Sequence, residues 1–299
     1  MAREYEIVWV DAFTTTPLAG NACAVVLDAR GLDDAAMQAI ARETNLSETS
    51  FVFPGEGDAD VVVRYWTPGG EIPLAGHPTI ATIHALFERD ALPPGRDVVR
   101  VKMPAAVIPV TIRRGTPTTY AMSQPPPQFL APFPRADAAA ALRLPEDDLL
   151  PGVTPQTVST GTPQLMIALA SRDALDRAEP DRRALFRDPR RDWFSVHVFC
   201  RNPDVTLNVS KGHVLEARHF ADFGDVIEDP FTGSATGGMA AYCARYEIVR
   251  ERAYAVAQGM HVHRPGRAEV EVGGNPPHAI GRITVAGPAV TVLEGTLRL

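Results

Sequence analysis

The chain has 299 residues, of which 45% are hydrophobic and 22% are charged, a globular composition with room for about two domains. The 27 prolines and 23 glycines are spread along the sequence, which excludes disordered, collagen-like and coiled-coil chains. A formal net charge of −7 without a run of Lys or Arg argues against nucleic acid and membrane surfaces as partners. We therefore expect a small molecule as the partner.

Targeting signals and disulfides are not expected either. The N-terminal residues run directly into a strand pattern, and no uncharged apolar run approaches the roughly 18 residues of a membrane span. The three cysteines, Cys23, Cys200 and Cys243, are widely spaced, and each lies in an apolar stretch. This pattern predicts a soluble, cytoplasmic protein with buried, reduced thiols.

Short runs of β-forming residues dominate the first part of the chain, bounded by Gly, Pro and Asp. They predict strands over Tyr5–Val10, Ala22–Leu27, Ser50–Phe53, Val61–Trp66, Val98–Met103 and Val107–Arg113. Helical periodicity predicts two helices, over Asp33–Glu43 and from about Pro78 to Glu88.

A proline-rich segment, Gly115–Pro134, follows these elements and is interpreted as a crossover. We therefore predict an N-terminal half over residues 1–115 and a C-terminal half over residues 116–285, with a strand at about 286–299 completing the first half. The second half has a similar order of elements. It has predicted helices near Ala136–Leu142 and Ser234–Tyr246 and predicted strands near Gln164–Ala170, Ser195–Cys200, Val205–Val209 and His213–His219.

One motif occurs in both halves. The pattern Glu-x-Pro-apolar-x-Gly-x-x-Thr is found at Glu71–Thr79 and again at Glu228–Thr236. His77 and Ser234 occupy equivalent places, and each copy ends a loop and opens a helix of small, apolar residues. The shared pattern in a shared context favours an internal duplication.

The repeated turn is suited to binding an anion. A glycine at a helix start, Gly76 or Gly233 here, lets the backbone approach a ligand, and the first N–H groups of the helix carry partial positive charge. Two such helices in duplicated halves would face one another across the cleft between the halves and hold one small carboxylate. For each copy alone, an ordinary capped helix is the alternative.

Side chains that can transfer protons lie near these turns. His77 and Asp229 are inside the two copies of the motif, and Ser234 stands at the position equivalent to His77. A histidine at a helix start beside glycine is well placed for acid/base chemistry. Glu48 is a third candidate because it leads into an apolar strand, although an ordinary solvated carboxylate is the alternative.

Metal and cofactor motifs are weak or missing. His261-x-His263 alternates as on an edge strand, without a Cys or acidic residue nearby in the sequence, so we expect an edge strand and no metal. The sequence contains no dinucleotide-binding glycine pattern after a strand and no phosphate-binding loop. Gly-x-Ser-x-Gly is missing as well, so Ser234 is not expected to be a hydrolase nucleophile. We expect no cofactor.

Several motifs together resemble the phenazine biosynthesis PhzF-like isomerase family. They are Val10–Thr14 with Gly20-Asn21, Asn45–Thr49, Thr67–Thr79, Val158–Gly161, Arg218–Ala221 and Glu228–Ala235. The resemblance covers nearly the whole chain, and Glu-Asp-Pro-x-Thr-Gly-Ser-Ala is its most specific part. It implies an α+β fold of the diaminopimelate-epimerase type. In that fold two pseudo-symmetric halves each wrap a curled, mainly antiparallel sheet around a central helix, and the active site lies between them.

The resemblance also implies roles for individual residues. Glu48 corresponds to the family's catalytic acid/base, and the catalytic residues around the substrate would be His77, Asp229 and Ser234. The same motifs imply substrate-binding roles for Asn21, Ser47, Gly76, Gly161, Gly233 and Ala235. Related epimerases carry a cysteine at both turn positions, so the His and Ser found here argue against racemisation by two thiols.

The leading hypothesis is a cofactor-independent isomerase that moves a proton between carbons of a small, carboxylate-bearing metabolite. One alternative is an amino-acid-type epimerase with Glu48 and His77 as unlike bases. The other is a metabolite-binding protein of the same fold without turnover. A bacterial, cytoplasmic homodimer is the corresponding expectation for the assembly. Ala75, Pro78 and Gly266 stand where the family usually has other residues, so the substrate is not identified by the resemblance.

Overall fold

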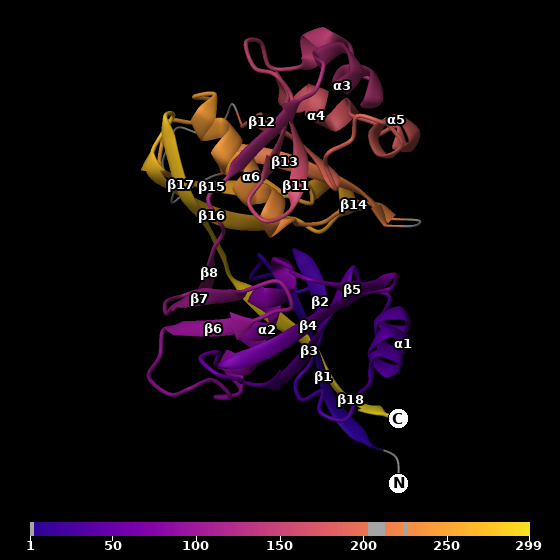
Figure 1. The fold of residues 1–299 in the computed structure, drawn as a ribbon, viewed down its shortest axis with the longest axis vertical. Helices are drawn as coiled ribbons and strands as arrows, with labels where there is room; N and C mark the ends of the chain where they lie inside the picture. Colours follow the sequence, from indigo (N-terminus) through magenta and orange to yellow (C-terminus); the bar gives the residue numbers. More distant parts are fainter. Residues whose placement is uncertain (1–2, 203–212, 224–225) are drawn as a thin grey trace. The chain divides into compact units, whose positions relative to one another are not determined.

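The structure, a computed structural model, describes residues 3–202, 213–223 and 226–299 (Figure 1). The chain divides into two compact units: unit 1 is Met1–Ser123 with Ala286–Leu299, and unit 2 is Gln124–Val285. The division falls after Ser123 and not near residue 115, because residues 119–123 pair as a strand with residues 107–113. The strand predicted over Val205–Val209 lies outside the described residues.

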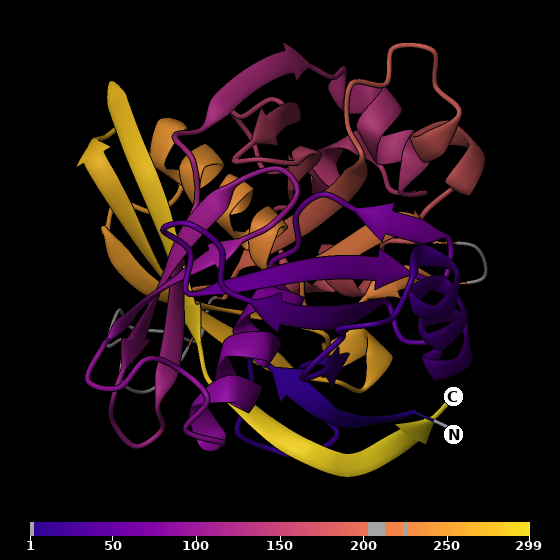
Figure 2. The same cartoon turned by 60° about the horizontal axis from the view of Figure 1, so that its bottom comes forward.

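Unit 1 is a mainly antiparallel sheet with two helices. Its strands are β1 (Glu4–Ala12), β2 (Asn21–Val26), β3 (Glu48–Pro54), β4 (Val61–Thr67), β5 (Gly70–Ile72), β6 (Val98–Lys102), β7 (Val107–Arg113), β8 (Thr119–Ser123) and β18 (Ala289–Arg298), and its helices are α1 (Asp34–Thr44) and α2 (His77–Glu88). Two pairs, β2 with β3 and β4 with β6, are parallel. The last strand, β18, runs antiparallel along β1, so the two ends of the chain lie side by side (Figure 2).

Helix α2 is the centre of unit 1. Every residue from His77 to Leu86 is buried, which is the pattern of a helix enclosed on all sides. It contacts β1, β2, β3, β8 and β18 and lies inside the curved sheet (Figure 1). Helix α1 covers the outer face of that sheet and buries Met37, Ile40 and Ala41 there. The carboxylate of Asp33 caps α1 by accepting the N–H of Ala36 at 2.8 Å.

Unit 2 also surrounds a central helix. Its strands are β9 (Gln128–Pro132), β10 (Gln156–Ser159), β11 (Pro163–Ala168), β12 (Ser195–Arg201), β13 (Leu215–Phe223), β14 (Val226–Asp229), β15 (Ala253–Gln258), β16 (Gly266–Asn275) and most of β17 (Ala279–Gly287). Its helices are α3 (Arg135–Ala141), α4 (Arg172–Arg177), α5 (Arg182–Phe186) and α6 (Gly233–Arg245), with short 3-10 turns η1 (Glu146–Asp148) and η2 (Met260–Val262). Helix α6 is almost wholly buried and contacts β10, β11 and β16.

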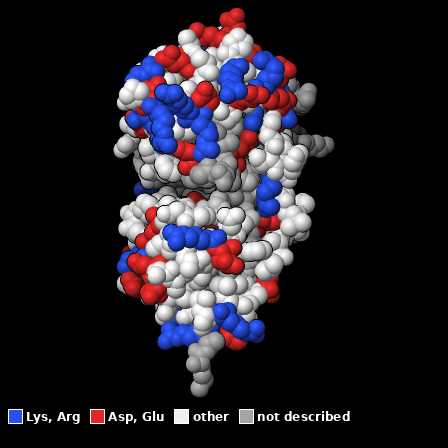
Figure 3. Space-filling model, turned by 90° about the vertical axis from the view of Figure 1, so that its right-hand side faces the viewer, with Lys and Arg blue, Asp and Glu red and all other residues white. Residues whose placement is uncertain are grey.

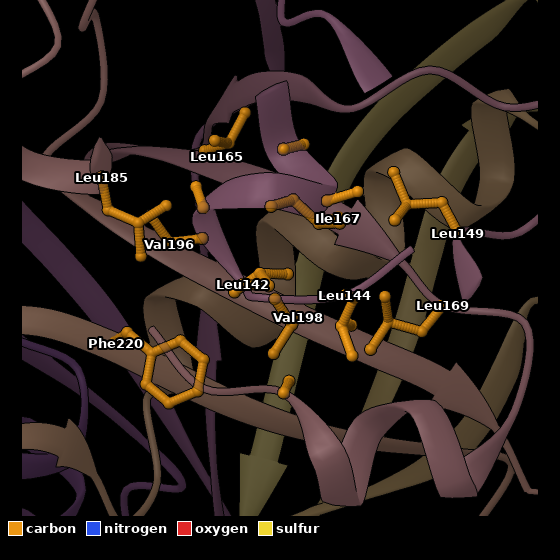
Figure 4. Packing of buried hydrophobic residues seen from close by; sticks show 14 of the residues in the cluster. Leu142, Leu144, Leu149, Leu165, Ile167, Leu169, Leu185, Val196, Val198 and Phe220 are labelled. Carbon is orange, nitrogen blue, oxygen red and sulfur yellow. The ribbon is translucent and has the colours of Figure 1, made fainter. Parts of the chain in front are cut away.

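Strands β11 and β12 of unit 2 bury both of their faces. One face packs with α3, α4 and α5 in a hydrophobic cluster that includes Leu142, Leu165, Ile167, Leu185, Val196, Val198 and Phe220 (Figure 4). The alternate residues of β11 face α6 instead, since a Cβ on Gly238 would lie 2.5 Å from Cε of Met166. Because β11 and β12 are covered on both faces, their sequences are mostly apolar and do not alternate with exposed polar residues.

The two units share one order of connections. In each, a parallel pair (β2 and β3, or β11 and β12) is followed by an antiparallel strand (β4, or β13) and a short strand (β5, or β14). A buried helix then leads to a strand (β6, or β15) that returns parallel to β4 or β13. The fold is therefore α+β, with two halves that each wrap a mainly antiparallel sheet around a helix, as predicted.

The repeated motif occupies the same register in both units. Glu71 pairs with Trp66 across β4 and β5, and Glu228 pairs with Phe220 across β13 and β14. The threonine that ends the motif also repeats its contact. Thr79 donates its hydroxyl to the carbonyl of Ala75 at 2.6 Å, and Thr236 donates to the carbonyl of Thr232 at 3.1 Å. This agreement supports the internal duplication.

Charged side chains of both signs lie next to one another on the face drawn in Figure 3. Arginines and carboxylates also form many ion pairs, such as Arg177 with Asp148 at 2.9 Å. Neighbouring charges of opposite sign weaken the field that either would produce alone. Among the helices of the described residues, none is long and apolar enough to cross a membrane.

Candidate active site

Two of the predicted catalytic residues are in direct contact in unit 1. Glu48 is the first residue of β3, and His77 is the first residue of α2. Glu48 Oε2 lies 3.2 Å from His77 Nδ1, and the two side chains are 18% and 5% exposed. A carboxylate and an imidazole at this distance can exchange a proton. The contact joins two segments that lie far apart in the sequence.

Asn21 contacts the same histidine nitrogen. It opens β2, and its Nδ2 lies 3.1 Å from His77 Nδ1, while Ser47 Oγ donates to Asn21 Oδ1 at 3.5 Å. Nδ1 of His77 therefore has an amide donor and a carboxylate as neighbours. It accepts from Asn21 when it carries no proton.

Gly20 sets the position of Asn21, and we expect Gly20→Ala to destabilise the protein by about 2–4 kcal/mol. Gly20 has φ +60°, and a Cβ there would lie 2.2 Å from the carbonyl oxygen of Ala12. Gly57→Ala is the matched control, because Gly57 has φ +62° but nothing within 4 Å of the added Cβ. It should lose only about 1 kcal/mol from the left-handed backbone. Urea unfolding measures the free energy of unfolding of both variants. Equal losses would show that the contact with Ala12 does not destabilise the protein.

In unit 2, the predicted catalytic residue Ser234 and the predicted binding residues Gly233 and Ala235 form the first turn of α6. Gln164 Nε2 donates to Ser234 Oγ at 3.1 Å, and Gln124 Nε2 donates to the carbonyl of Gly233 at 2.8 Å. These two buried amides fix the hydroxyl and the backbone of the turn. The side chains that hold the turn in position are therefore neutral and polar.

Sequence reasoning missed these glutamines and their neighbours. Thr160 donates to Gln124 Oε1 at 2.5 Å, and the glycine at position 237 leaves room for that amide, since a Cβ there would lie 1.9 Å from Gln124 Oε1. The available signal was a polar residue within or at the end of an apolar strand, as at Gln164 and Gln258. Buried polar side chains in such places need specific partners.

Asp229, the last residue of β14, is buried beside the same turn. Its carboxylate accepts the hydroxyl of Thr232, which precedes α6, and its carbonyl accepts from Gln258 Nε2 at 2.8 Å. Gln258 Oε1 in turn accepts the N–H of Thr232 at 3.2 Å. Asp229 thus holds the loop that opens α6. Gly161, another predicted binding residue, is exposed between β10 and β11 and has φ +132°.

The two helix starts differ in their capacity to bind an anion. Gly76 precedes α2, but Pro78 in the first turn has no N–H to donate. The first turn of α6 contains Gly233, Ser234 and Ala235, each of which has a backbone N–H. Because the attraction for an anion comes from these N–H groups, the start of α6 is the stronger of the two candidate sites.

All three cysteines are free and buried, as predicted. Cys23 pairs with Glu48 in the register of β2 and β3, and its Sγ lies 3.4 Å from Ser50 Oγ. Burial raises the pKa of the Cys23 thiol to about 12 and that of Cys200 to about 12, and it raises the pKa of Cys243 as well. The thiols therefore stay protonated at neutral pH and are poor bases.

The edge strand predicted at His261 and His263 is wrong. Gly259 has φ +94°, and a Cβ there would lie 2.2 Å from the carbonyl of Arg264, so the chain turns tightly through η2. His261 Nε2 lies 2.9 Å from Asp176 Oδ1, an acidic neighbour from a distant segment. Two groups do not make a metal centre, and the described parts of the chain hold no cluster of three or more such ligands.

The chain shows extensive similarity to known proteins. Residues 10–295 match the family of phenazine biosynthesis-like proteins. The chain is 32% identical over 292 residues to the isomerase YfhB of Bacillus subtilis, with 96% of this chain and 97% of that protein covered. It is also 32% identical over 298 residues to the trans-2,3-dihydro-3-hydroxyanthranilate isomerase of Pseudomonas fluorescens, with 99% and 100% covered.

Solved structures agree with this similarity. The crystal structure of a PhzF-family phenazine biosynthesis protein from Bacillus anthracis matches with a TM-score of 0.86 and 32% identity, covering 99% of each chain. A hydroxyproline epimerase from Agrobacterium vitis matches with a TM-score of 0.64 at 11% identity, over 99% of this chain and 92% of that one, which is a likeness of fold alone.

The fold thus defines a two-unit α+β protein of the diaminopimelate-epimerase type, and the chain is an isomerase. It belongs to the phenazine biosynthesis-like family.

Proposed function

We propose that the chain moves a proton between two carbons of a small, carboxylate-bearing substrate without a cofactor, and that Glu48 is the acid/base. The contact of Glu48 Oε2 with His77 Nδ1 at 3.2 Å carries this proposal. Glu48 would take the proton from one carbon and return it to another, and His77, 3.2 Å from the Glu48 carboxylate, would hold that carboxylate in place. Asn21 and Ser47 would hold His77 and the substrate in place.

The turn of unit 2 would bind the substrate carboxylate. The N–H groups of Gly233, Ser234 and Ala235 and the hydroxyl of Ser234 are neutral donors that suit an anion. Asp229 would keep the turn in position, since its carboxylate accepts the hydroxyl of Thr232. Gly76 and Gly161 would contribute backbone to substrate binding.

The duplication favours proton transfer by a single group. Val196 pairs with Phe220 as Thr49 pairs with Trp66, so Ser195 stands in unit 2 where Glu48 stands in unit 1. Ser195 is buried and carries no ionisable group at neutral pH. The unit 2 copy therefore offers no second base at the position of Glu48, which favours abstraction and return by one carboxylate.

The geometry disfavours an epimerase with Glu48 and His77 as opposed bases. Such an enzyme needs its bases on opposite sides of one carbon, each about 3–3.5 Å from it, so that the bases are roughly 6–7 Å apart. Glu48 and His77 are separated by only 3.2 Å and leave no room for a carbon between them. The buried, protonated thiols do not supply an alternative pair of bases.

Proton NMR tests the proposal. The protein is incubated with trans-2,3-dihydro-3-hydroxyanthranilate and a panel of small amino and hydroxy carboxylates, after dialysis against a chelator. We expect a constitutional isomer of one of them to form. A stereoisomer would show an epimerase, binding without change would show a binding protein, and activity lost on chelation would contradict a cofactor-independent reaction.

The source of the transferred proton is a sharper measurement. Glu48 is largely shielded from water, so part of the abstracted hydrogen should return to the product before it exchanges. In deuterated water, mass spectrometry after a few turnovers should detect product that retains substrate hydrogen. Complete incorporation of solvent deuterium in the first product would mean open exchange or a second base.

A further inference from the structure

Arg64 joins three elements of unit 1. It lies on β4, and its Nε and Nη2 donate to the two carboxylate oxygens of Glu71 on β5 at 2.6 and 2.8 Å. The guanidinium carbon is 5.4 Å from the centre of the Trp66 ring. Its Nη1 donates to Asp34 at the start of α1 at 2.8 Å. We call Arg64, Trp66 and Glu71 the clamp of unit 1.

Arg218 makes the same ion pair and ring contact in unit 2, and its third contact is with backbone carbonyls instead of a carboxylate. Its Nε and Nη2 donate to the two oxygens of Glu228 at 3.1 and 2.8 Å, and its guanidinium carbon is 5.0 Å from the ring of Phe220. Its Nη1 donates to the carbonyls of Leu175 and Ala178, at the end of α4, at 3.0 and 2.7 Å. Arg218, Phe220 and Glu228 form the clamp of unit 2.

The clamps explain why the repeated motif begins with a glutamate in both units. Glu71 and Glu228 precede Gly76 and Gly233 by the same number of residues. In both units the arginine lies two residues before the aromatic residue that pairs with that glutamate. The ion pair and the ring contact are therefore present in both copies, although the ring is Trp in one and Phe in the other.

Each clamp sits where the chain leaves the sheet for a buried helix. A two-pronged contact between a guanidinium and a carboxylate fixes direction as well as distance, which a single charge does not. In unit 1 the arginine and glutamate side chains are 26% and 30% exposed. In unit 2 they are more deeply buried, with 10% exposure each. The glutamate backbone is thus held at the point from which the loop runs to His77 or Ser234.

We propose that Arg64 and Arg218 are positioning residues for the isomerase reaction, each orienting the turn that opens one of the two central helices. The inference rests on the proposed function for its kinetic consequences. The turn of unit 1 carries His77 against Glu48, so its displacement should slow proton transfer. The turn of unit 2 carries the donors for the carboxylate, so its displacement should weaken substrate binding.

The same substitution in the two clamps should therefore change different kinetic constants. We expect Arg64→Gln to lower kcat by about 10-fold or more with little change in KM, because proton transfer is sensitive to small displacements. Arg218→Gln should raise KM by about 10-fold with little change in kcat, because it removes binding that ground state and transition state share. The assay uses the carboxylate that the wild-type protein turns over.

Matched controls separate the clamps from ordinary ion pairs. Arg30 is 68% exposed at the surface and forms a two-pronged pair with Asp28 through Nε and Nη2, and Arg190 forms one with Asp188. Arg30→Gln and Arg190→Gln should leave kcat and KM unchanged. If Arg64→Gln or Arg218→Gln does not fold, then Glu71→Gln and Glu228→Gln weaken the same pairs with smaller changes in shape, and should give the same division between kcat and KM.

Histidine-ring NMR tests the positioning without a substrate. Arg64→Gln should shift the ring nitrogen signals of His77 and change its balance of tautomers, whereas Arg218→Gln should leave those signals unchanged. If the wild-type protein turns over no carboxylate but His77 responds to Arg64→Gln, the positioning inference holds and the proposed function fails. Variants that melt at lower temperature while kcat, KM and the His77 signals stay at wild-type values would overturn the inference.

Discussion

Glu48→Gln is expected to lower turnover by about 10²- to 10⁴-fold, because glutamine keeps the shape of the side chain and removes the proton acceptor. The melting temperature should change little, since the side chain stands at the start of β3 and remains partly exposed. Steady-state kinetics and thermal unfolding of the same preparation measure the two quantities. A large loss of rate in a stable variant would assign the chemistry to this carboxylate.

Glu43→Gln is the matched control for that experiment. Glu43 is exposed on α1 and lies in the same unit, and the substitution removes the same charge. It should leave both turnover and melting temperature unchanged. Normal activity in Glu48→Gln would remove Glu48 from the mechanism and would leave His77 as the proton acceptor to test next.

Gly233→Val is expected to weaken binding of the substrate carboxylate by about 10²-fold or more, because a branched side chain would occupy the space in which the anion meets the first N–H groups of α6. Gly76→Val should also weaken binding, but less, since Pro78 already removes one donor from the start of α2. Calorimetric titration with the carboxylate that the protein turns over measures both affinities.

Gly295→Val controls for the added bulk. Gly295 lies in β18, and the nearest atom to a Cβ placed there is a side-chain carbon of Leu293 at 4.0 Å. We expect this variant to bind like the wild type. Wild-type affinity in Gly233→Val would show that the turn of unit 2 only begins a helix, and the same result in Gly76→Val would show this for unit 1.

The duplication gives a framework for these experiments. Both units keep the clamp and the threonine contact, which shape the turn, but they differ at the two positions that could carry chemistry. Unit 1 has Glu48 and His77 where unit 2 has Ser195 and Ser234. The repeated residues therefore maintain the fold of each turn. In the proposed reaction, the residues that differ give proton transfer to unit 1 and carboxylate binding to unit 2.

The sequence alone was sufficient for features that depend on near neighbours. The starts of α2 and α6 were predicted to within one residue, because glycine, proline and the change to helical periodicity mark a helix end locally. The repeated motif was found from the order of its residues, and the α+β class was implied by the resemblance to the phenazine biosynthesis PhzF-like family. The turn at His261 was missed because the left-handed glycine before it, Gly259, overrides the apparent alternation.

Tertiary structure decided which of these residues meet. Glu48 contacts His77 only because α2 lies inside the sheet that β3 helps to form, and Glu71 and Glu228 acquire their function only when a register places an arginine opposite them. The glutamines around Ser234 come from strands that α6 brings together. Such contacts depend on the pairing and packing of distant segments, which local propensity does not determine, whereas helix starts and turns are set by the residues within them.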